Sequence, residues 1–121
     1  MTIIDFNLLP GKVEELRNVF IKHRILERSF EIKGCWKLAM VSPQDRDDFV
    51  QVLGFWENEA AYQEWLDNPE RSLGTEDMLP LLKTDWDKGA PGRIMNVLLN
   101  EPKDVEAWSK PAQAGEMKGK K

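Results

Sequence analysis

The first residues of the chain alternate between apolar and polar side chains, which predicts a half-buried strand over residues 2–8. In an extended chain, one side of this segment carries Ile4, Phe6 and Leu8, and the other side carries Ile3, Asp5 and Asn7. A period of two is typical of a strand that buries one face. Pro10-Gly11 then ends the extended pattern.

The next pattern has a helical period. Apolar side chains recur three and four residues apart at Val13, Leu16, Val19, Phe20, Leu26 and Phe30. This spacing predicts one helix from about Lys12 to Phe30. Gly34 marks the following boundary.

Two further strands are expected over residues 35–41 and 49–56, separated by the polar turn of residues 42–47. So short a connection predicts an antiparallel hairpin. A second helix is expected over residues 59–67, ending before Pro69, because a residue before proline disfavours the helical conformation. A shorter third helix is expected over residues 75–87, a loop at 89–92 and a last strand over 93–99.

The resulting order is β-α-β-β-α-(α)-β, which is the ferredoxin-like arrangement of the α+β class with a four-stranded antiparallel sheet. Helices cover one face of such a sheet, and the other face stays apolar and needs a cover. A second copy of the same sheet is the simplest cover. The pattern therefore predicts a homodimer that forms through the sheet face with two-fold symmetry.

Composition narrows the class of protein. The chain has 121 residues, a net charge of −4, one cysteine and one histidine, which predicts one domain without a disulfide or a zinc site. The acidic balance argues against nucleic acid as a partner. No apolar run approaches the roughly 18 residues of a membrane span, and the amino terminus lacks a signal-peptide pattern. We expect a cytoplasmic protein with a domain over residues 1–99 and a tail over 100–121 that contains Trp108.

Several short motifs resemble the antibiotic biosynthesis monooxygenase domain family over about residues 1–99. They are Pro10-Gly11-Lys12 with Glu15-Leu16, Gly34-Cys35, Phe55-Trp56-Glu57, and Ala61-Tyr62-x-x-Trp65-Leu66. The resemblance implies a dimeric α+β barrel with a ferredoxin-like protomer. Members of the family include cofactor-independent oxygenases of aromatic polyketides, haem-degrading enzymes and signal-molecule isomerases.

The haem-degrading branch does not fit this sequence. That branch uses an asparagine in the first strand, a tryptophan in the second helix and a histidine about ten residues later. Trp65 matches the tryptophan, but Gly74-Thr75 occupies the place of the histidine, and Asn7 is displaced by about three positions. Without an axial imidazole the iron has no obvious protein ligand, so we reject haem degradation.

The candidate catalytic groups are His23 and Glu27. On a helical wheel, His23 lies within the apolar stripe of the first helix, and Glu27 follows one turn later. A carboxylate at this spacing orients an imidazole and raises its basicity, which suits removal of a proton from a phenol or an enol. The alternative is a core histidine that is hydrogen-bonded to a carboxylate and has no substrate.

The candidate substrate-binding residues are Asn7, Trp56, Tyr62 and Trp65. The three aromatic side chains could line a slot for a flat ligand, while Asn7 could orient a substrate oxygen or O2. Packing between the second helix and the sheet is the alternative for the aromatic residues. For Asn7 the alternative is hydrogen bonding to the backbone near Pro10. Cys35 is expected to be a buried apolar residue.

The sequence shows no phosphate loop and no flavin or nicotinamide motif. Any oxygenase reaction would then use an electron-rich substrate as the reductant of O2. The leading hypothesis is a cofactor-independent monooxygenase-like protein that acts on a small aromatic or enolic metabolite. The alternatives are a non-catalytic small-molecule binding module and a structural dimer whose cavity is filled by its own side chains.

Overall fold

Four antiparallel strands form the sheet in the computed structural model, which describes residues 1–83 and 92–99. They are β1 (Thr2–Asn7), β2 (Cys35–Val41), β3 (Phe49–Trp56) and β4 (Arg93–Ile94). Their order across the sheet is β2-β3-β1-β4, so strands adjacent in sequence pair in the β2–β3 hairpin while β1 lies in the middle. This topology confirms the predicted ferredoxin-like fold of the α+β class.

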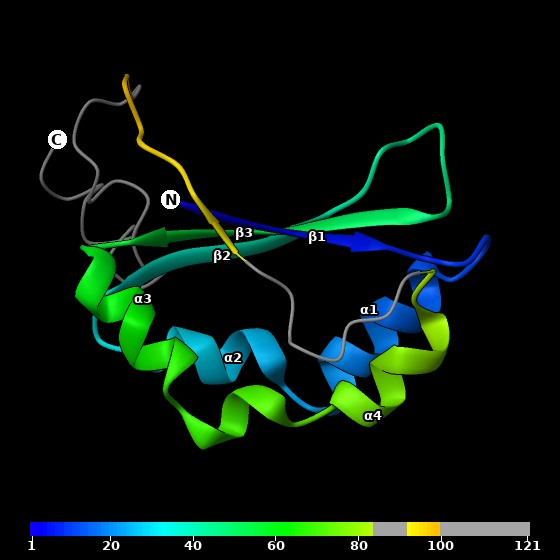
Figure 1. Ribbon diagram of the computed structural model, residues 1–121, viewed down its shortest axis with the longest axis horizontal. Helices are drawn as coiled ribbons and strands as arrows, with labels where there is room; N and C mark the ends of the chain where they lie inside the picture. Colours follow the sequence, from blue (N-terminus) through cyan, green and yellow to red (C-terminus); the bar gives the residue numbers. More distant parts are fainter. Residues whose placement is uncertain (84–91, 100–121) are drawn as a thin grey trace, which may run out of the picture.

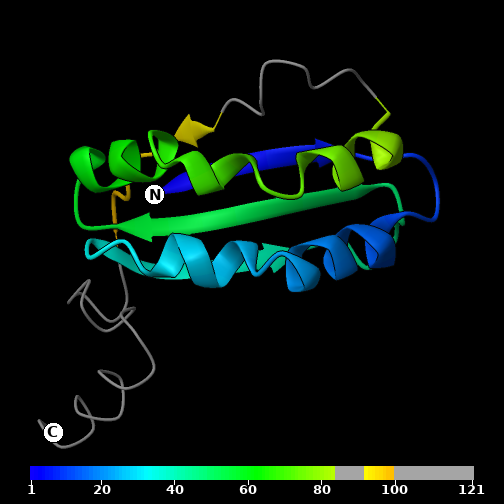
Figure 2. The ribbon, with the colours of Figure 1, turned by 90° about the horizontal axis from the view of Figure 1, so that it is seen from below.

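The helices all lie on one face of the sheet, in two rows (Figures 1 and 2). One row holds α1 (Val13–Lys22) and α2 (Ile25–Phe30). The other holds α3 (Glu59–Leu66), the short 3₁₀ helix η1 (Pro69–Ser72), α4 (Thr75–Met78) and the 3₁₀ helix η2 (Leu79–Leu81). The predicted end of the second helix before Pro69 is confirmed.

The single helix expected over residues 12–30 is wrong, because the chain breaks between α1 and α2. Arg24 adopts a left-handed backbone conformation with φ of 53°, which interrupts the helical hydrogen-bond ladder and is unfavourable for a residue with a side chain. Arg28 compensates by donating from Nε to the His23 carbonyl at 2.7 Å. The break turns α2 so that its apolar residues continue along the sheet.

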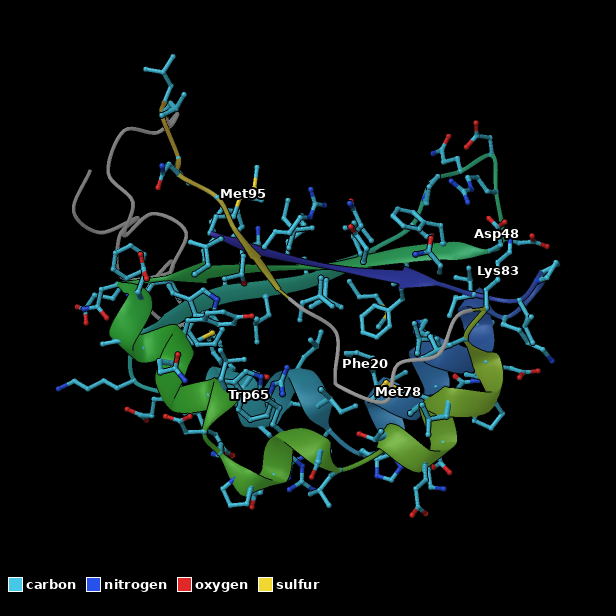
Figure 3. All side chains as sticks on the ribbon, in the orientation of Figure 1. Phe20, Asp48, Trp65, Met78, Lys83 and Met95 are labelled. Atoms are coloured by element: carbon cyan, nitrogen blue, oxygen red, sulfur yellow. The ribbon has the colours of Figure 1, made fainter. Side chains whose placement is uncertain are left out.

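Alternation along the strands decides which side chains meet the helices. Thr2, Ile4 and Phe6 lie opposite Gly54, Val52 and Val50 of β3. Phe6, Val50 and Val52 are buried in the main core together with Leu16 and Phe20 of α1. Figure 3 shows Phe20, Trp65 and Met78 between the sheet and the helical rows. Cys35 is fully buried, as expected.

The carboxyl-terminal elements are shorter than predicted. The third helix is interrupted after four residues, since Pro80 lies in η2 and cannot continue an α-helical ladder. Regular pairing in the last strand covers only Arg93–Ile94. The last part of the predicted third helix, residues 84–87 with Trp86, lies outside the described residues, as do the loop at 89–91 and the tail over 100–121 with Trp108.

Within residues 1–83 and 92–99, no helix lies on the second face of the sheet (Figure 1). Its central positions include Ile3, paired with Leu53 of β3, and Ala39 of β2 on the other side of Leu53. Beyond β4 the segment of residues 95–99 extends away from the helical side, and Leu98 and Leu99 are 86% and 94% exposed. The described residues of the single chain do not cover this face of the sheet. Within residues 1–83 and 92–99, no helix has both the length and the apolar character required to cross a membrane.

Candidate functional site

A cavity of about 300 Å³ lies between the sheet and the helices. Its floor comes from residues of β1, β2 and β3 that face the helices, and its walls come from α1, α2, α3 and the stretch of residues 71–78. Most of the lining is aliphatic or aromatic. This size and composition are typical of a site for a small and mainly apolar ligand.

Trp56, Tyr62 and Trp65 meet at this cavity. Trp56 ends β3, and the Asn58 side chain caps α3 by accepting a hydrogen bond from the Ala61 amide at 2.9 Å. The cap starts the helix so that Tyr62 and Trp65 turn toward the sheet. The Trp56 and Tyr62 rings lie 5.3 Å apart at 57°. The structure therefore brings together the three aromatic residues that the sequence analysis selected, and their role in binding stays a prediction.

Gly54 determines how Trp56 sits at the cavity. A Cβ atom at Gly54 would lie 2.5 Å from Trp56 Nε1 and 2.7 Å from Thr2 Oγ1. In this space Trp56 Nε1 donates a hydrogen bond to Thr2 Oγ1 at 3.0 Å. The absence of a side chain at Gly54 thus lets the indole satisfy its polar group across the strand pair.

The Tyr62 hydroxyl has no hydrogen-bond partner among the described residues, although its oxygen is buried. The residue is only 6% exposed, and this burial raises the pKa of the phenol, partly offset by the positive charge of Arg71. A buried hydroxyl without a partner costs free energy. Tyr62 is therefore a protonated donor at neutral pH that a ligand oxygen could satisfy.

Arg71 is the charged residue of the cavity lining. It lies in η1 and is partly buried, and its guanidinium makes no hydrogen bond or ion pair with another described residue. The neighbouring Glu70 is instead held by Arg28, at 3.1 Å from Nη1 to Oε1. A free guanidinium beside an apolar cavity is suited to an anionic oxygen.

The predicted pairing of His23 with Glu27 is wrong. The helix break removes the spacing on which it depended, and Glu27 is an exposed residue whose Oε2 lies 3.6 Å from Arg24 Nε. His23 ends α1, and its Nε2 lies 2.8 Å from Asp77 Oδ2 of α4. The imidazole is not among the groups that line the cavity, so the catalytic role assigned to His23 and Glu27 stays a prediction without a contact to this site.

The expected position of Asn7 in the cavity is also wrong. Asn7 lies between Phe6 and Leu8, which are both buried under the helices. Because neighbouring residues of a strand point to opposite faces, the exposed Asn7 side chain faces away from the cavity. Its backbone carbonyl accepts a hydrogen bond from the Lys83 amide at 2.8 Å.

No pattern in the sequence indicated that residues 71–78 contribute to the cavity. Arg71, Ser72, Thr75 and Met78 all line the cavity. They lie in short helical turns separated by Gly74, whose φ is 89°, so they show no periodic pattern. Only the position of these turns over α1 and α2 brings them to the site. Across residues 1–83 and 92–99, no three His, Cys, Asp or Glu side chains are grouped so that they could hold a metal ion.

Comparison with solved structures supports the fold. The chain is similar to SnoaB, a cofactor-independent oxygenase from Streptomyces nogalater, with 15% identity, a TM-score of 0.67, and coverage of 84% of this chain and 94% of that one. A conserved protein from Methanosarcina mazei Go1 matches with 14% identity, a TM-score of 0.64, and coverage of 78% and 88%. At these identities the similarity shows the fold alone.

Sequence comparison identifies the family. A search of proteins with curated functions found no match. The family model of antibiotic biosynthesis monooxygenases matches residues 1–72, which include β1, the β2–β3 hairpin and the three aromatic residues of the cavity. The chain therefore belongs to the antibiotic biosynthesis monooxygenase family.

Proposed function

We propose that this protein is a cofactor-independent monooxygenase-like protein that binds a small aromatic or enolic metabolite in the cavity between the sheet and the helices. The observation that carries this proposal is the cavity itself, which Trp56, Tyr62 and Trp65 line and at which the buried Tyr62 hydroxyl has no described partner. Aromatic walls hold a flat ring by edge and stacking contacts. The hydroxyl then fixes the orientation of one ligand oxygen.

The chemistry that suits this site uses electrons from the substrate. A methylene group between conjugated rings and one O2 molecule give a carbonyl group and one water, so that no external reductant is needed. Removal of a proton from the substrate precedes its reaction with O2. None of the described residues lining the cavity is a carboxylate or an imidazole, which favours a substrate acidic enough to ionise in water near neutral pH.

Oxygen consumption tests the proposal. The purified protein is mixed with anthrones, quinols and related enols without any added cofactor, and O2 uptake is followed with an electrode. We expect uptake above the uncatalysed rate with at least one substrate, and its loss in Trp65→Ala, which removes a large part of the cavity wall. Uptake that never exceeds the uncatalysed rate, or that is unchanged in Trp65→Ala, contradicts the oxygenase proposal.

The same assay tests the predicted role of His23. Loss of turnover in His23→Asn, with the fold retained by circular dichroism, would support His23 as the proton acceptor. Unchanged turnover would remove His23 and Glu27 from the mechanism.

A non-catalytic binding module is the second candidate function. Among the described lining residues there is no carboxylate or imidazole to accept a proton, which favours this function because binding a flat ligand requires no proton transfer. A ligand that quenches the fluorescence of Trp56 and Trp65 without any O2 consumption would identify this function.

We further propose a homodimer in which the sheet faces of two chains cover each other. The support is the sheet face that no described helix covers, with Ile3 and Leu53 at its centre, together with the exposed Val97, Leu98 and Leu99 in the segment that follows β4. Exposed apolar surface of this kind is typical of an interaction site.

A further inference from the structure

We infer that the cavity selects ligands whose flat, apolar body carries one anionic oxygen group, bound by Arg71 and by the Tyr62 hydroxyl. This inference rests on the proposed function and specifies the substrate class for the same site. The shared chemistry is that of an enolate, a phenolate or a carboxylate on an aromatic frame.

The first support is the isolation of the Arg71 charge. Two acidic residues of the same segment already have other partners. Glu70 is bound to Arg28, and Asp77 is bound to Lys22 and His23. No described carboxylate lies within ion-pair distance of Arg71. A guanidinium at the rim of an apolar cavity gains more from an anionic partner than one in bulk water does, because the local dielectric constant is lower.

The second support is the unsatisfied hydrogen-bonding capacity at Tyr62. Three other polar side chains of the lining have partners: Thr2 Oγ1 accepts from Trp56, Ser29 Oγ donates to the Ile25 carbonyl at 2.9 Å, and Ser72 Oγ donates to the Pro69 carbonyl at 3.1 Å. Tyr62 Oη is the buried side-chain oxygen that has none among the described residues. A ligand oxygen at the Tyr62 end of the cavity would accept this hydrogen bond.

The third support is that both groups line one cavity. The charge of Arg71 is also close enough to act on the phenol of Tyr62. Together they offer a positive charge and a neutral donor, which is the combination that stabilises a localised oxygen anion. Most of the remaining lining is apolar. For a ligand with several charges, the free energy lost on removing its charges from water would therefore exceed the free energy gained from contacts in the site.

Two probes of the same shape separate the effect of ligand charge on binding from the effect of ligand size. The probes are 2-naphthoate, which carries a carboxylate, and 2-naphthamide, which is neutral, and their dissociation constants are measured by isothermal titration calorimetry at pH 7. We expect the wild-type protein to bind the carboxylate about tenfold or more tightly than the amide, as a charge-assisted hydrogen bond would give.

Arg71→Met and Arg17→Met form a matched pair of variants. Both remove one positive charge, but Arg17 lies on α1 beside Glu14, at 3.0 Å from Nη1 to Oε1, and does not line the cavity. We expect the carboxylate preference to disappear in Arg71→Met and to persist in Arg17→Met. An unchanged preference in Arg71→Met would show that the guanidinium only covers the cavity with its aliphatic stem, and would overturn the inference.

Tyr62→Phe tests the hydroxyl separately. We expect weaker binding of 2-naphthoate, by about threefold to tenfold, while the midpoint of thermal unfolding without ligand does not fall, because the lost hydroxyl had no partner. A lower midpoint would show that the hydroxyl is already satisfied in the free protein, and would overturn its assignment.

The outcomes also separate this inference from the proposed function. Equal binding of both probes, with Arg71→Met unchanged, would overturn the inference and leave a cavity that binds aromatic ligands. Failure of both probes to bind the wild-type protein would overturn the proposal of an aromatic-binding cavity, and the inference with it.

Discussion

Gly54 controls the geometry of the aromatic cluster. The position lies on the helical face of β3, where it pairs with Thr2 of β1 and Leu38 of β2. Because Gly54 has no side chain, the Trp56 indole has room to form its hydrogen bond with Thr2. A glycine within a strand normally weakens it, so its presence here marks a close approach between side chains that a larger residue would prevent.

We expect Gly54→Ala to destabilise the protein by about 1–3 kcal/mol, as inserting a methyl group into a closely packed site does. The added Cβ would displace the Trp56 indole and break its hydrogen bond to Thr2. Urea unfolding followed by circular dichroism measures the loss. Ligand binding is expected to weaken as well, because Trp56 lines the cavity.

Trp56→Phe provides the control for this substitution. If the collision with the indole nitrogen causes the loss of stability, Gly54→Ala should lower the free energy of unfolding less in the Trp56→Phe background than in the wild type. The effects of substitutions at two contacting residues are not additive. Equal costs in the two backgrounds would show that the indole is not the group displaced.

The turns of residues 69–81 are held over the cavity by ionic contacts with the first helical row. Asp77 of α4 accepts from His23 at 2.8 Å and lies 3.2 Å from Lys22 Nζ. Arg28 of α2 joins Glu70 of η1 and also binds the carbonyl at the end of α1. The helix break at Arg24 and these contacts therefore belong together, because the break places α1 and α2 against different turns of the segment.

Asp77→Asn is expected to destabilise the protein in a manner that depends on pH. The hydrogen bond from His23, and then that from Lys22, lower the pKa of the Asp77 carboxyl below its ordinary value of 3.8. The folded protein therefore prefers the charged form, and this stability is present above pH 3.8 and lost as the pH falls through the lowered pKa. Urea unfolding midpoints measured between pH 2 and pH 7 should show wild type and variant converging at the acidic end.

Glu76→Gln is the matched control for Asp77→Asn. Glu76 is the exposed neighbour of Asp77 in α4, and no salt bridge connects it to another described residue. We expect its substitution to leave the unfolding midpoint nearly unchanged across the same pH range. A constant difference between wild type and Asp77→Asn at every pH would contradict the role given to the charged carboxylate.

The uncovered sheet face and the exposed segment beyond β4 form one apolar side of the molecule. Figure 1 shows this side opposite both helical rows, and Figure 3 shows Met95 on it. The face also carries a polar group of Asp5, Gln51 and Arg93, in which Asp5 accepts from Gln51 at 2.9 Å and from Arg93 at 3.0 Å. In the proposed homodimer, this polar group would lie between the two sheets.

We expect Leu53→Glu to convert the protein from a dimer to a monomer. Leu53 lies in β3 at the centre of the uncovered face, between Ile3 and Ala39, and a buried carboxylate without a partner is strongly unfavourable. Light scattering coupled to size exclusion should give twice the 14.0 kDa chain mass for the wild type and a single chain mass for the variant.

Ile21→Glu is the control for the dimer prediction. Ile21 is apolar and 56% exposed, but it lies on α1 on the helical side of the sheet. The variant is expected to keep the mass of the wild-type protein. A wild-type protein of one chain mass, or an unaffected Leu53→Glu dimer, would contradict pairing through the sheet face.

The fold could be predicted because its signals are local. Alternation placed Ile4 and Phe6 on one face of a strand, the polar turn of residues 42–47 joined a hairpin, and Pro69 ended α3. The single helix over residues 12–30 was a wrong prediction for a related reason. Its apolar period continues through Arg24, and a left-handed residue in the backbone leaves no trace in the spacing of side chains.

The site was predicted only where one local element supplies it. Trp56, Tyr62 and Trp65 come from one strand and the helix that follows it, so their spacing alone brings them together. The direction of the Asn7 side chain and the pairing of His23 with Glu27 were wrong predictions, because a side chain's direction depends on strand register and on where a helix ends. Arg71 lies in a turn without periodic pattern, and no sequence signal distinguishes it from the other surface arginines.

The amino-acid sequence by itself determined the order of strands and helices, the family and the three aromatic residues of the cavity, because these follow from contacts between neighbours along the chain. Only the tertiary structure decided that Arg71 lines the cavity, that the Tyr62 hydroxyl is buried without a described partner, and that His23 binds Asp77. These relations join residues of separate elements, and packing in three dimensions sets the distances between them.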